Sequence, residues 1–154
     1  MINLPSQLVP SELLCCEELP QYVDDLLRSC RSRCREGELL EAERHAQDIV
    51  DAARGPDKEL AQAVALIHRA DVRREMGKLG PALANCEQAH RIFQRQRSRC
   101  QRHNLAVATY ALGLAHQLLG AEMDALGHYQ EADHLFERVR EDWAAVNDAA
   151  HVAA

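Results

Sequence analysis

The side chains best suited to chemistry in this chain are its six cysteines and eight histidines. Cys30 and Cys34 stand four residues apart, so their thiols share one face if the segment is helical. A structural zinc site would need two further ligands within tetrahedral reach, which only the adjacent Cys15 and Cys16 suggest. However, the chain contains no C-x₂-C and no H-x₃-H spacing. We therefore expect no metal site, and we interpret Cys30 as a small side chain packed where two helices cross.

Catalytic motifs are missing from the sequence as well. The histidines are scattered, and there is no G-x-S-x-G elbow and no phosphate-binding loop. A cysteine and a histidine that only the fold brings together stay open as a nucleophilic pair. We predict a non-enzymatic protein that uses no cofactor.

The beginning of the chain bears on the state of the cysteines. The segment MINLPSQLVPSELL lacks the basic start and long apolar run of a signal peptide, and no stretch has the length of a membrane span. An even number of cysteines permits disulfides, but cytosolic proteins usually keep their thiols reduced. We therefore predict reduced cysteines, a cytoplasmic location and no membrane contact.

The net charge of −6 argues against general nucleic-acid binding, because that mode takes most of its energy from basic side chains that neutralise phosphates. Arginines nevertheless form two runs. The first run comprises Arg28, Arg31, Arg33 and Arg35. The second run comprises Arg91, Arg95, Arg97, Arg99 and Arg102. We interpret the second run as a solvated helical connector, with contact to an acidic partner or RNA as the alternative.

The elements that position these side chains follow from a pattern repeated around Gly37, Gly77 and Gly120. Alanine and leucine are abundant, which favours helices. Seven residues before the glycines stand the small residues Cys30, Ala70 and Gly113. Five residues after them stand Ala42, Ala82 and Ala125. Nine and twelve residues after them stand Ala46, Cys86 and Tyr129, then Ile49, Ala89 and Ala132. The pattern predicts helical hairpins in which glycine ends the first helix in the left-handed conformation and small residues permit a close crossing.

This pattern resembles the tetratricopeptide repeat, whose signature is a small residue, a turn glycine and A-x₃-F-x₂-A on the second helix. The third unit, LGLAHQLLGAEMDALGHYQEA, is closest, and the second, ADVRREMGKLGPALANCEQA, is similar. The first, CRSRCREGELLEAERHAQDI, lacks the aromatic residue, and all three lack the signature's tryptophan and closing proline. The glycines stand 40 and 43 residues apart instead of about 34, as in the long-helix repeats of kinesin light chains, spindle-orientation adaptors and bacterial signalling regulators.

The resemblance covers about residues 21–140 and implies an all-α fold. That fold is a right-handed solenoid of three antiparallel helix hairpins, at about 21–53, 57–97 and 102–140. The first helix of the third hairpin is apolar around most of its circumference. We expect it to be buried, with an exposed interaction patch as the alternative.

Terminal segments are expected to flank the hairpins. Residues 1–20 are predicted to form an N-terminal extension with a short helix. Residues 141–154 are predicted to form a capping helix, because Trp143, Val146 and Ala150 continue the helical spacing and the last hairpin exposes a face.

In the family that the chain resembles, the first helices of the repeats line a concave groove that holds a peptide or protein. The matching positions are Leu27, Arg31 and Arg35, then Ile67, Asp71 and Arg74, then Tyr110, Leu114 and Gln117. The resemblance implies an adaptor or scaffold that binds a protein segment with acidic and hydrophobic ends. The lysine and asparagine clamp of chaperone adaptors is not matched, since its sites carry Leu27 and Arg31.

Other interpretations remain open beside the adaptor. The chain resembles, in architecture only, the dedicated chaperones of secreted proteins, and it also suits a peptide-sensing fragment of a signalling regulator. The segment MINLPSQLVPSELL is a candidate to fill the groove of its own chain or of a second copy, which allows a homodimer.

Overall fold

The computed structural model describes residues 9–53, 55 and 58–153, and the side chains of its last helix as far as Ala145. This part of the chain is all-α, as predicted, and contains no strand. Its elements are η1 (Pro10–Leu13), α1 (Gln21–Arg35), α2 (Leu39–Ala52), α3 (Lys58–Glu75), α4 (Leu79–Gln94), α5 (Arg99–Leu118) and α6 (Glu122–Ala153).

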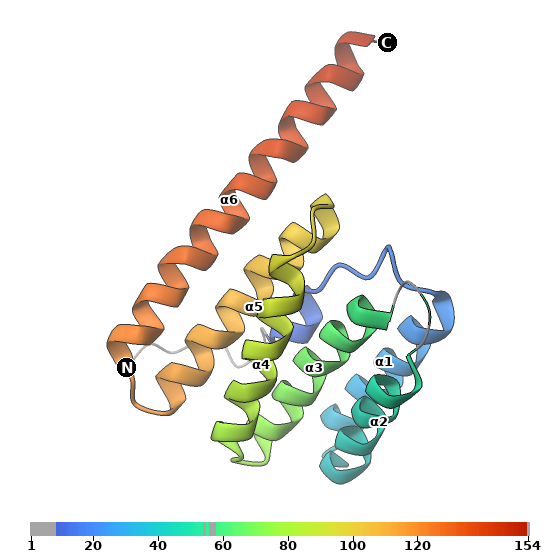
Figure 1. Cartoon of the computed structure of the whole chain (residues 1–154), viewed down its shortest axis with the longest axis vertical. Coiled ribbons are helices and arrows are strands. Elements are labelled where there is room, and N and C mark those ends of the chain that lie inside the picture. Colours follow the sequence, from blue (N-terminus) through green and yellow to red (C-terminus); the bar gives the residue numbers. More distant parts are fainter. Residues whose placement is uncertain (1–8, 54, 56–57, 154) are drawn as a thin grey trace.

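Neighbouring helices pack against each other from α1 to α6 (Figure 1). Helix α3 also contacts both α1 and α5, so these three helices lie side by side. The 3₁₀ turn η1 lies within the predicted N-terminal extension and packs on α3 and α5. Residues 1–8 of that extension lie outside the described part.

The same turn joins the helices of each pair. In the first, the Gly37 nitrogen donates to the Cys34 oxygen and the Glu38 nitrogen to the Arg33 oxygen, which is a Schellman arrangement. The equivalent two bonds recur around Gly77 and Gly120. All three glycines have φ between 78° and 83°, a region that side chains with a Cβ resist. The predicted role of these glycines is therefore confirmed.

Small side chains permit the close helix crossings. Ala70 is fully buried, and a Cβ on Gly113 would lie 2.7 Å from the Tyr129 ring. The Cys30 thiol is buried and donates to the Ala42 oxygen at 3.2 Å, so it fills the crossing of α1 and α2 as expected. The repeated positions after the glycines are likewise buried, except for the half-buried Tyr129.

Helix α5 is buried around most of its circumference, as its apolar sequence predicts. Helices α3, α4 and α6 and the turn η1 all contact it. Apolar side chains such as Val107, Leu112 and Leu114 are buried, and only the end of the helix leaves Leu118 and Leu119 exposed.

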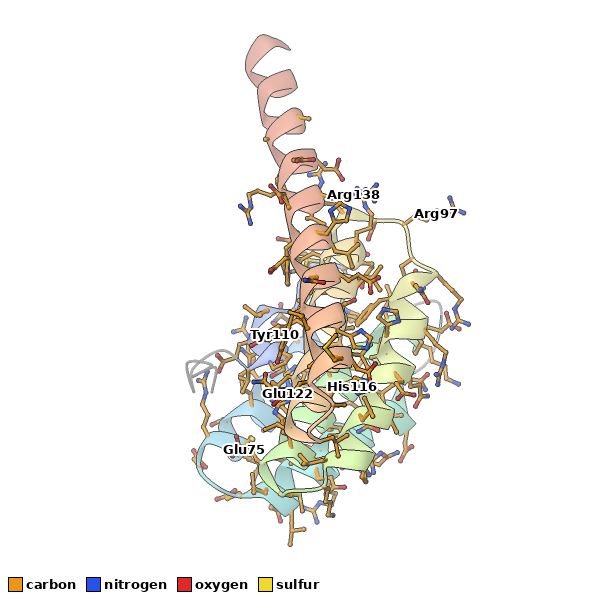
Figure 2. The ribbon with its side chains drawn as sticks, turned by 90° about the vertical axis from the view of Figure 1, so that its left-hand side faces the viewer. Glu75, Arg97, Tyr110, His116, Glu122 and Arg138 are labelled. Atoms are coloured by element: carbon orange, nitrogen blue, oxygen red, sulfur yellow. A yellow bond between two sulfur atoms is a disulfide. The ribbon has the colours of Figure 1, made fainter. Side chains whose placement is uncertain are left out.

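Helix α6 is continuous to Ala153. It runs antiparallel to α5 and continues past the N-terminal end of α5 (Figures 1 and 2). Within the described part it packs on α5 alone, through Ala125, Ala132 and Val139. The tail from residue 141 therefore continues α6 and does not turn back as a separate cap, and the sequence from residue 128 to residue 154 contains no glycine and no proline. The side chains of Val146 and Ala150 are outside the described part.

A search of the described helices finds none with both the length and the apolar character needed to cross a bilayer.

Candidate binding face and the segment that covers it

The face formed by α3 and α5 is covered by an irregular segment of the same chain, residues 9–19, which we call the strap. The strap runs across both helices through η1 before it reaches α1. Its Pro10 is fully buried, and its Leu14, Cys16 and Leu19 pack against the main apolar core. The strap therefore occupies the surface that the family resemblance assigns to a guest.

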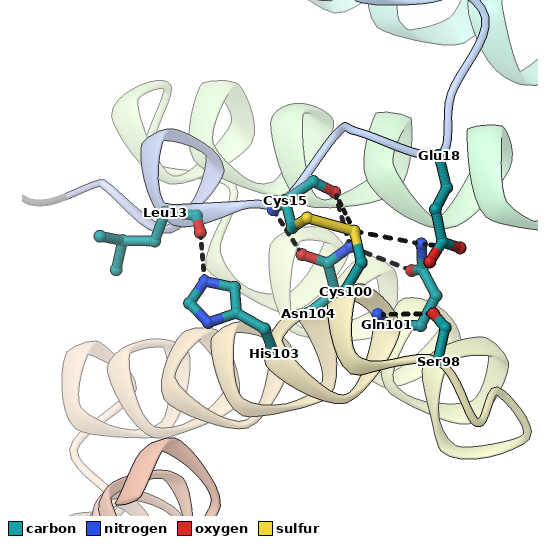
Figure 3. Close-up of a disulfide and its surroundings, with 8 residues drawn as sticks. All are labelled: Leu13, Cys15, Glu18, Ser98, Cys100, Gln101, His103 and Asn104. Carbon is teal, nitrogen blue, oxygen red and sulfur yellow. Dashed lines mark hydrogen bonds between the residues drawn. A yellow bond between two sulfur atoms is a disulfide. The ribbon is translucent and has the colours of Figure 1, made fainter. Parts of the chain in front are cut away.

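Side chains of α5 and α3 hold the strap by its backbone (Figure 3). Asn104 accepts from the Cys15 nitrogen at 2.7 Å and donates to the Cys15 oxygen at 2.9 Å. His103 donates through Nε2 to the Leu13 oxygen at 2.7 Å, and Asp71 accepts from the Ser11 nitrogen at 3.0 Å. These bonds go to backbone groups and so do not depend on the side chains of Ser11, Leu13 and Cys15.

Side chains of the strap make fewer polar contacts. Glu12 forms an ion pair with Arg35 of α1. Glu18 accepts a hydrogen bond from Gln101, whose own oxygen accepts one from Asn104 at 3.0 Å. The strap thus carries both acidic side chains and apolar side chains that contact the helices.

A disulfide links the strap to α5, between Cys15 and Cys100, whose Cα atoms lie 5.5 Å apart. The prediction of six reduced cysteines is wrong for this pair. The two residues are 85 positions apart in the sequence, and only the course of the strap brings them together. The other cysteines, Cys16, Cys30, Cys34 and Cys86, are free.

Two of the predicted groove residues are unavailable to a guest. Leu27 and Ile67 have no exposed surface, because the core between the strap, α1 and α3 encloses them. Leu114 is only 9% exposed. The predicted apolar floor of the groove is therefore part of the core, and the strap supplies the apolar side chains that cover it.

The predicted polar residues of the second hairpin lie under the strap. The carboxylate of Asp71 is buried, pairs with Arg74 at 3.1 Å and accepts the Ser11 bond. Burial raises the pKa of Asp71, although Arg74 and the Ser11 bond act in the opposite direction. Asp71 thus holds both the groove arginine and the strap backbone.

Tyr110 and Gln117 of the third hairpin come together at Tyr129 of α6. The two tyrosine rings lie 5.7 Å apart, and the Tyr129 hydroxyl donates to Gln117 at 2.6 Å. Burial raises the pKa of Tyr129 to about 12. Figure 2 shows Tyr110 on the side of α5 that faces the N-terminal segment.

Arg31 and Arg35 of the first hairpin line two hollows that adjoin the strap. The larger, of about 710 Å³, lies between the strap and α1, and the smaller, of about 430 Å³, reaches from η1 to α3. Ser11 and Glu12 of the strap line both hollows. This end of the face is therefore only partly filled by the strap.

The smaller hollow is also lined by Cys30, Cys34 and His68. These residues are therefore the candidates for the cysteine–histidine nucleophilic pair that the sequence left open. Burial raises the pKa of Cys30 to about 12 and also raises that of Cys34. Burial, with Arg31 nearby, lowers the pKa of His68 to about 3, so this ring is neutral. A reactive cysteine needs a lowered thiol pKa, so the environment here opposes nucleophilic chemistry. Within the described residues, no three metal-ligating side chains converge.

The second arginine run surrounds the connection from α4 to α5. Arg95 lies 3.6 Å from Glu59, and Arg102 lies 2.8 Å from Asp142. The Arg99 guanidinium covers the Trp143 ring at 4.5 Å from its centroid. Arg97 projects away from the helices (Figure 2). Most of this run is thus engaged within the chain.

The residues that hold the strap by its backbone, Asn104 and His103, were not among the predicted site residues. The repeat offsets were counted back from the turn glycine, and both residues lie at the other end of α5. Both residues stand in the polar start of α5, Arg99–Asn104, so nothing in the sequence singles them out.

Comparison with protein-family models, with curated proteins and with solved structures finds no match to this chain.

Proposed function

We propose that this chain is a non-enzymatic interaction module whose α3–α5 face binds an extended segment of another protein. The observation that carries the proposal is the strap itself. It lies on that face as an irregular segment that includes the turn η1, and Asn104, His103 and Asp71 bind its backbone groups.

The tetratricopeptide-type interpretation supports this proposal. The three equivalent glycine turns and the lateral contacts of α3 with α1 and α5 agree with stacked helical hairpins. Proteins built in this way use the surface of their first helices to bind extended chains. We therefore regard the chain as a solenoid of three hairpins that acts as an adaptor or scaffold.

The strap also indicates the chemistry of the guest. The buried Pro10 and Leu19 and the half-buried Leu14 are apolar anchors, and Glu12 and Glu18 place carboxylates next to Arg35 and Gln101. We propose that the guest is an extended segment that combines apolar anchors with acidic residues.

A peptide experiment tests this proposal with the full chain. The receptor carries Leu14→Asp and Cys15→Ser, which remove an apolar anchor and the disulfide from the strap and leave α3 and α5 unchanged. The probe is a fluorescent peptide of residues 9–19 with Cys15→Ser and Cys16→Ser. We expect saturable binding by fluorescence anisotropy, because the peptide then has the better anchors of the two competing segments.

The matched control adds Asn104→Leu to the same receptor. Loss of two hydrogen bonds to the guest backbone is expected to weaken peptide binding by about tenfold or more. Circular dichroism checks that both receptors keep their helices. A peptide that does not bind, or that binds equally to both receptors, contradicts the proposed binding face.

A further inference from the structure

We propose that the strap is an internal competitor for the binding face and that the Cys15–Cys100 disulfide controls whether it leaves. This inference rests on the proposed function and adds its regulation. In the oxidised chain the face is closed to guests, and in the reduced chain a guest can replace the strap.

The position of the disulfide is the first support. Cys100 and Asn104 are four residues apart on α5, so the covalent bond and the paired backbone bonds of Cys15 are next to each other. While the disulfide is intact, Cys15 cannot move away from Asn104. A guest backbone therefore cannot reach the amide that would bind it.

The limited noncovalent hold on the strap is the second support. Backbone bonds at Ser11, Leu13 and Cys15 and a few apolar anchors offset the entropy lost when this segment is ordered. The strap has no strand partner, and its regular structure is limited to η1 and one hydrogen-bonded turn between Cys16 and Leu19. Such segments open locally while the rest of a protein stays folded.

Access to the disulfide is the third support. Both of its cysteines are only half-buried, and they line a hollow of about 370 Å³ together with Arg99, His103 and Trp143. A dithiol can therefore approach the sulfur atoms without unfolding the chain. Of the free cysteines, Cys16 lines the larger hollow and Cys30 and Cys34 the smaller one, so none of them shares the hollow of the disulfide.

The chemical step is a thiol–disulfide exchange with a dithiol reductant, either a small molecule or a thioredoxin-type protein. A thiolate of the reductant attacks one sulfur, the Cys15–Cys100 bond breaks, and a mixed disulfide forms. The second thiol of the reductant then displaces the remaining cysteine. The reductant gives up two electrons and two protons and ends as a disulfide. Cys15 and Cys100 take them up and become free thiols.

Cys16, next to Cys15, is a poor competitor for the bond with Cys100. Burial raises the pKa of its thiol, and nearby Asp24 adds to this effect, so little thiolate is available to attack. The strap therefore has two states, joined to Cys100 or free.

Hydrogen exchange and peptide binding, measured on the full chain with and without a dithiol, test the proposal together. We expect reduction to speed exchange of the strap amides by about tenfold or more while α3 and α4 keep their protection. The peptide of residues 9–19 with Cys15→Ser and Cys16→Ser is expected to bind the reduced chain at least about tenfold more tightly than the oxidised chain. A Cys100→Ser chain should show the reduced behaviour with and without the dithiol.

Each other outcome has a definite meaning. Unchanged strap exchange after reduction overturns the control by the disulfide. Loss of protection in α3 and α4 together with the strap also overturns it, because the disulfide then holds the whole fold. Equal peptide binding in both states overturns the control but leaves the binding face intact. Faster strap exchange without any peptide binding leaves the disulfide control standing and contradicts the proposed function.

Discussion

The side-chain amide of Asn104 pairs with the backbone of Cys15 in both directions, at 2.7 Å to its nitrogen and 2.9 Å to its oxygen. Asn104 is fully buried, so the amide and the backbone groups that it binds depend on each other. A third bond, to the oxygen of Gln101, fixes the orientation of the amide. This pairing sets the register of the strap on α5.

Replacing Asn104 by leucine tests the pairing. The apolar side chain leaves the nitrogen and oxygen of Cys15 without their partner, at a cost of about 2–4 kcal/mol in the free energy of unfolding. Urea denaturation followed by circular dichroism measures the change. Gln88→Leu on the exposed face of α4 serves as the control and should stay within about 0.5 kcal/mol. Equal effects of the two substitutions would show that the Asn104 bonds add no stability.

The disulfide predicts both a thiol count and a stability change. Thiol titration of the denatured chain should find the four free cysteines before reduction and all six after it. Cys100→Ser is expected to lower the unfolding free energy by about 2–4 kcal/mol, because it releases a long closed loop. Cys34→Ser, at a half-buried free thiol, should cost less. Six reactive thiols in the unreduced chain would contradict the bond.

Gly113 and Gly127 make a matched pair of glycine substitutions. Gly113→Ala places a methyl group 2.7 Å from the Tyr129 ring, and we expect a loss of about 1–3 kcal/mol from the displaced ring. Gly127→Ala meets nothing within 4 Å on exposed α6, so it should stabilise the helix by up to about 1 kcal/mol. Thermal unfolding of both variants measures the opposite signs. A stabilising Gly113→Ala would mean that α5 and α6 are not in close contact there.

His68 predicts a loss of stability in acid. Its folded pKa of about 3 lies below the ordinary value of 6.5, so between these values the unfolded chain binds the extra proton. Stability attributable to His68 therefore falls as the pH drops below 6.5, by about 2 kcal/mol between pH 7 and pH 5. In urea titrations, the unfolding free energy of the His68→Gln variant should fall by about 2 kcal/mol less than that of the unchanged chain between pH 7 and pH 5. An equal loss in the variant would show that His68 is accessible to protons in the folded chain.

The fold was predictable because it follows local rules. The turn glycines end helices whatever lies around them, and the small residues before and after them mark the crossings. The same spacing points to Cys30, Ala70 and Gly113 from the sequence alone. These signals act within about twenty residues, so the sequence carries them directly.

The candidate site was less predictable because it depends on contacts between distant residues. Nothing near Cys15 indicates that it meets Cys100, because the two residues stand 85 positions apart in the sequence. Offsets counted from the glycines gave the first-helix residues but could not show that the strap and the core enclose Leu27 and Ile67. That the N-terminal segment can fill the face was recognised only as one alternative.

The cross-link between Cys15 and Cys100 encloses α1 to α4 within one covalent ring. Arrays of stacked helix pairs usually fray from their free ends, since each pair is supported by its neighbour alone. Here the disulfide ring ties the N-terminal helix pair to α5. Helix α6 lies outside this ring and, among the described elements, contacts only α5. Unravelling should therefore begin at the C-terminal end of the molecule and reach the opposite end last.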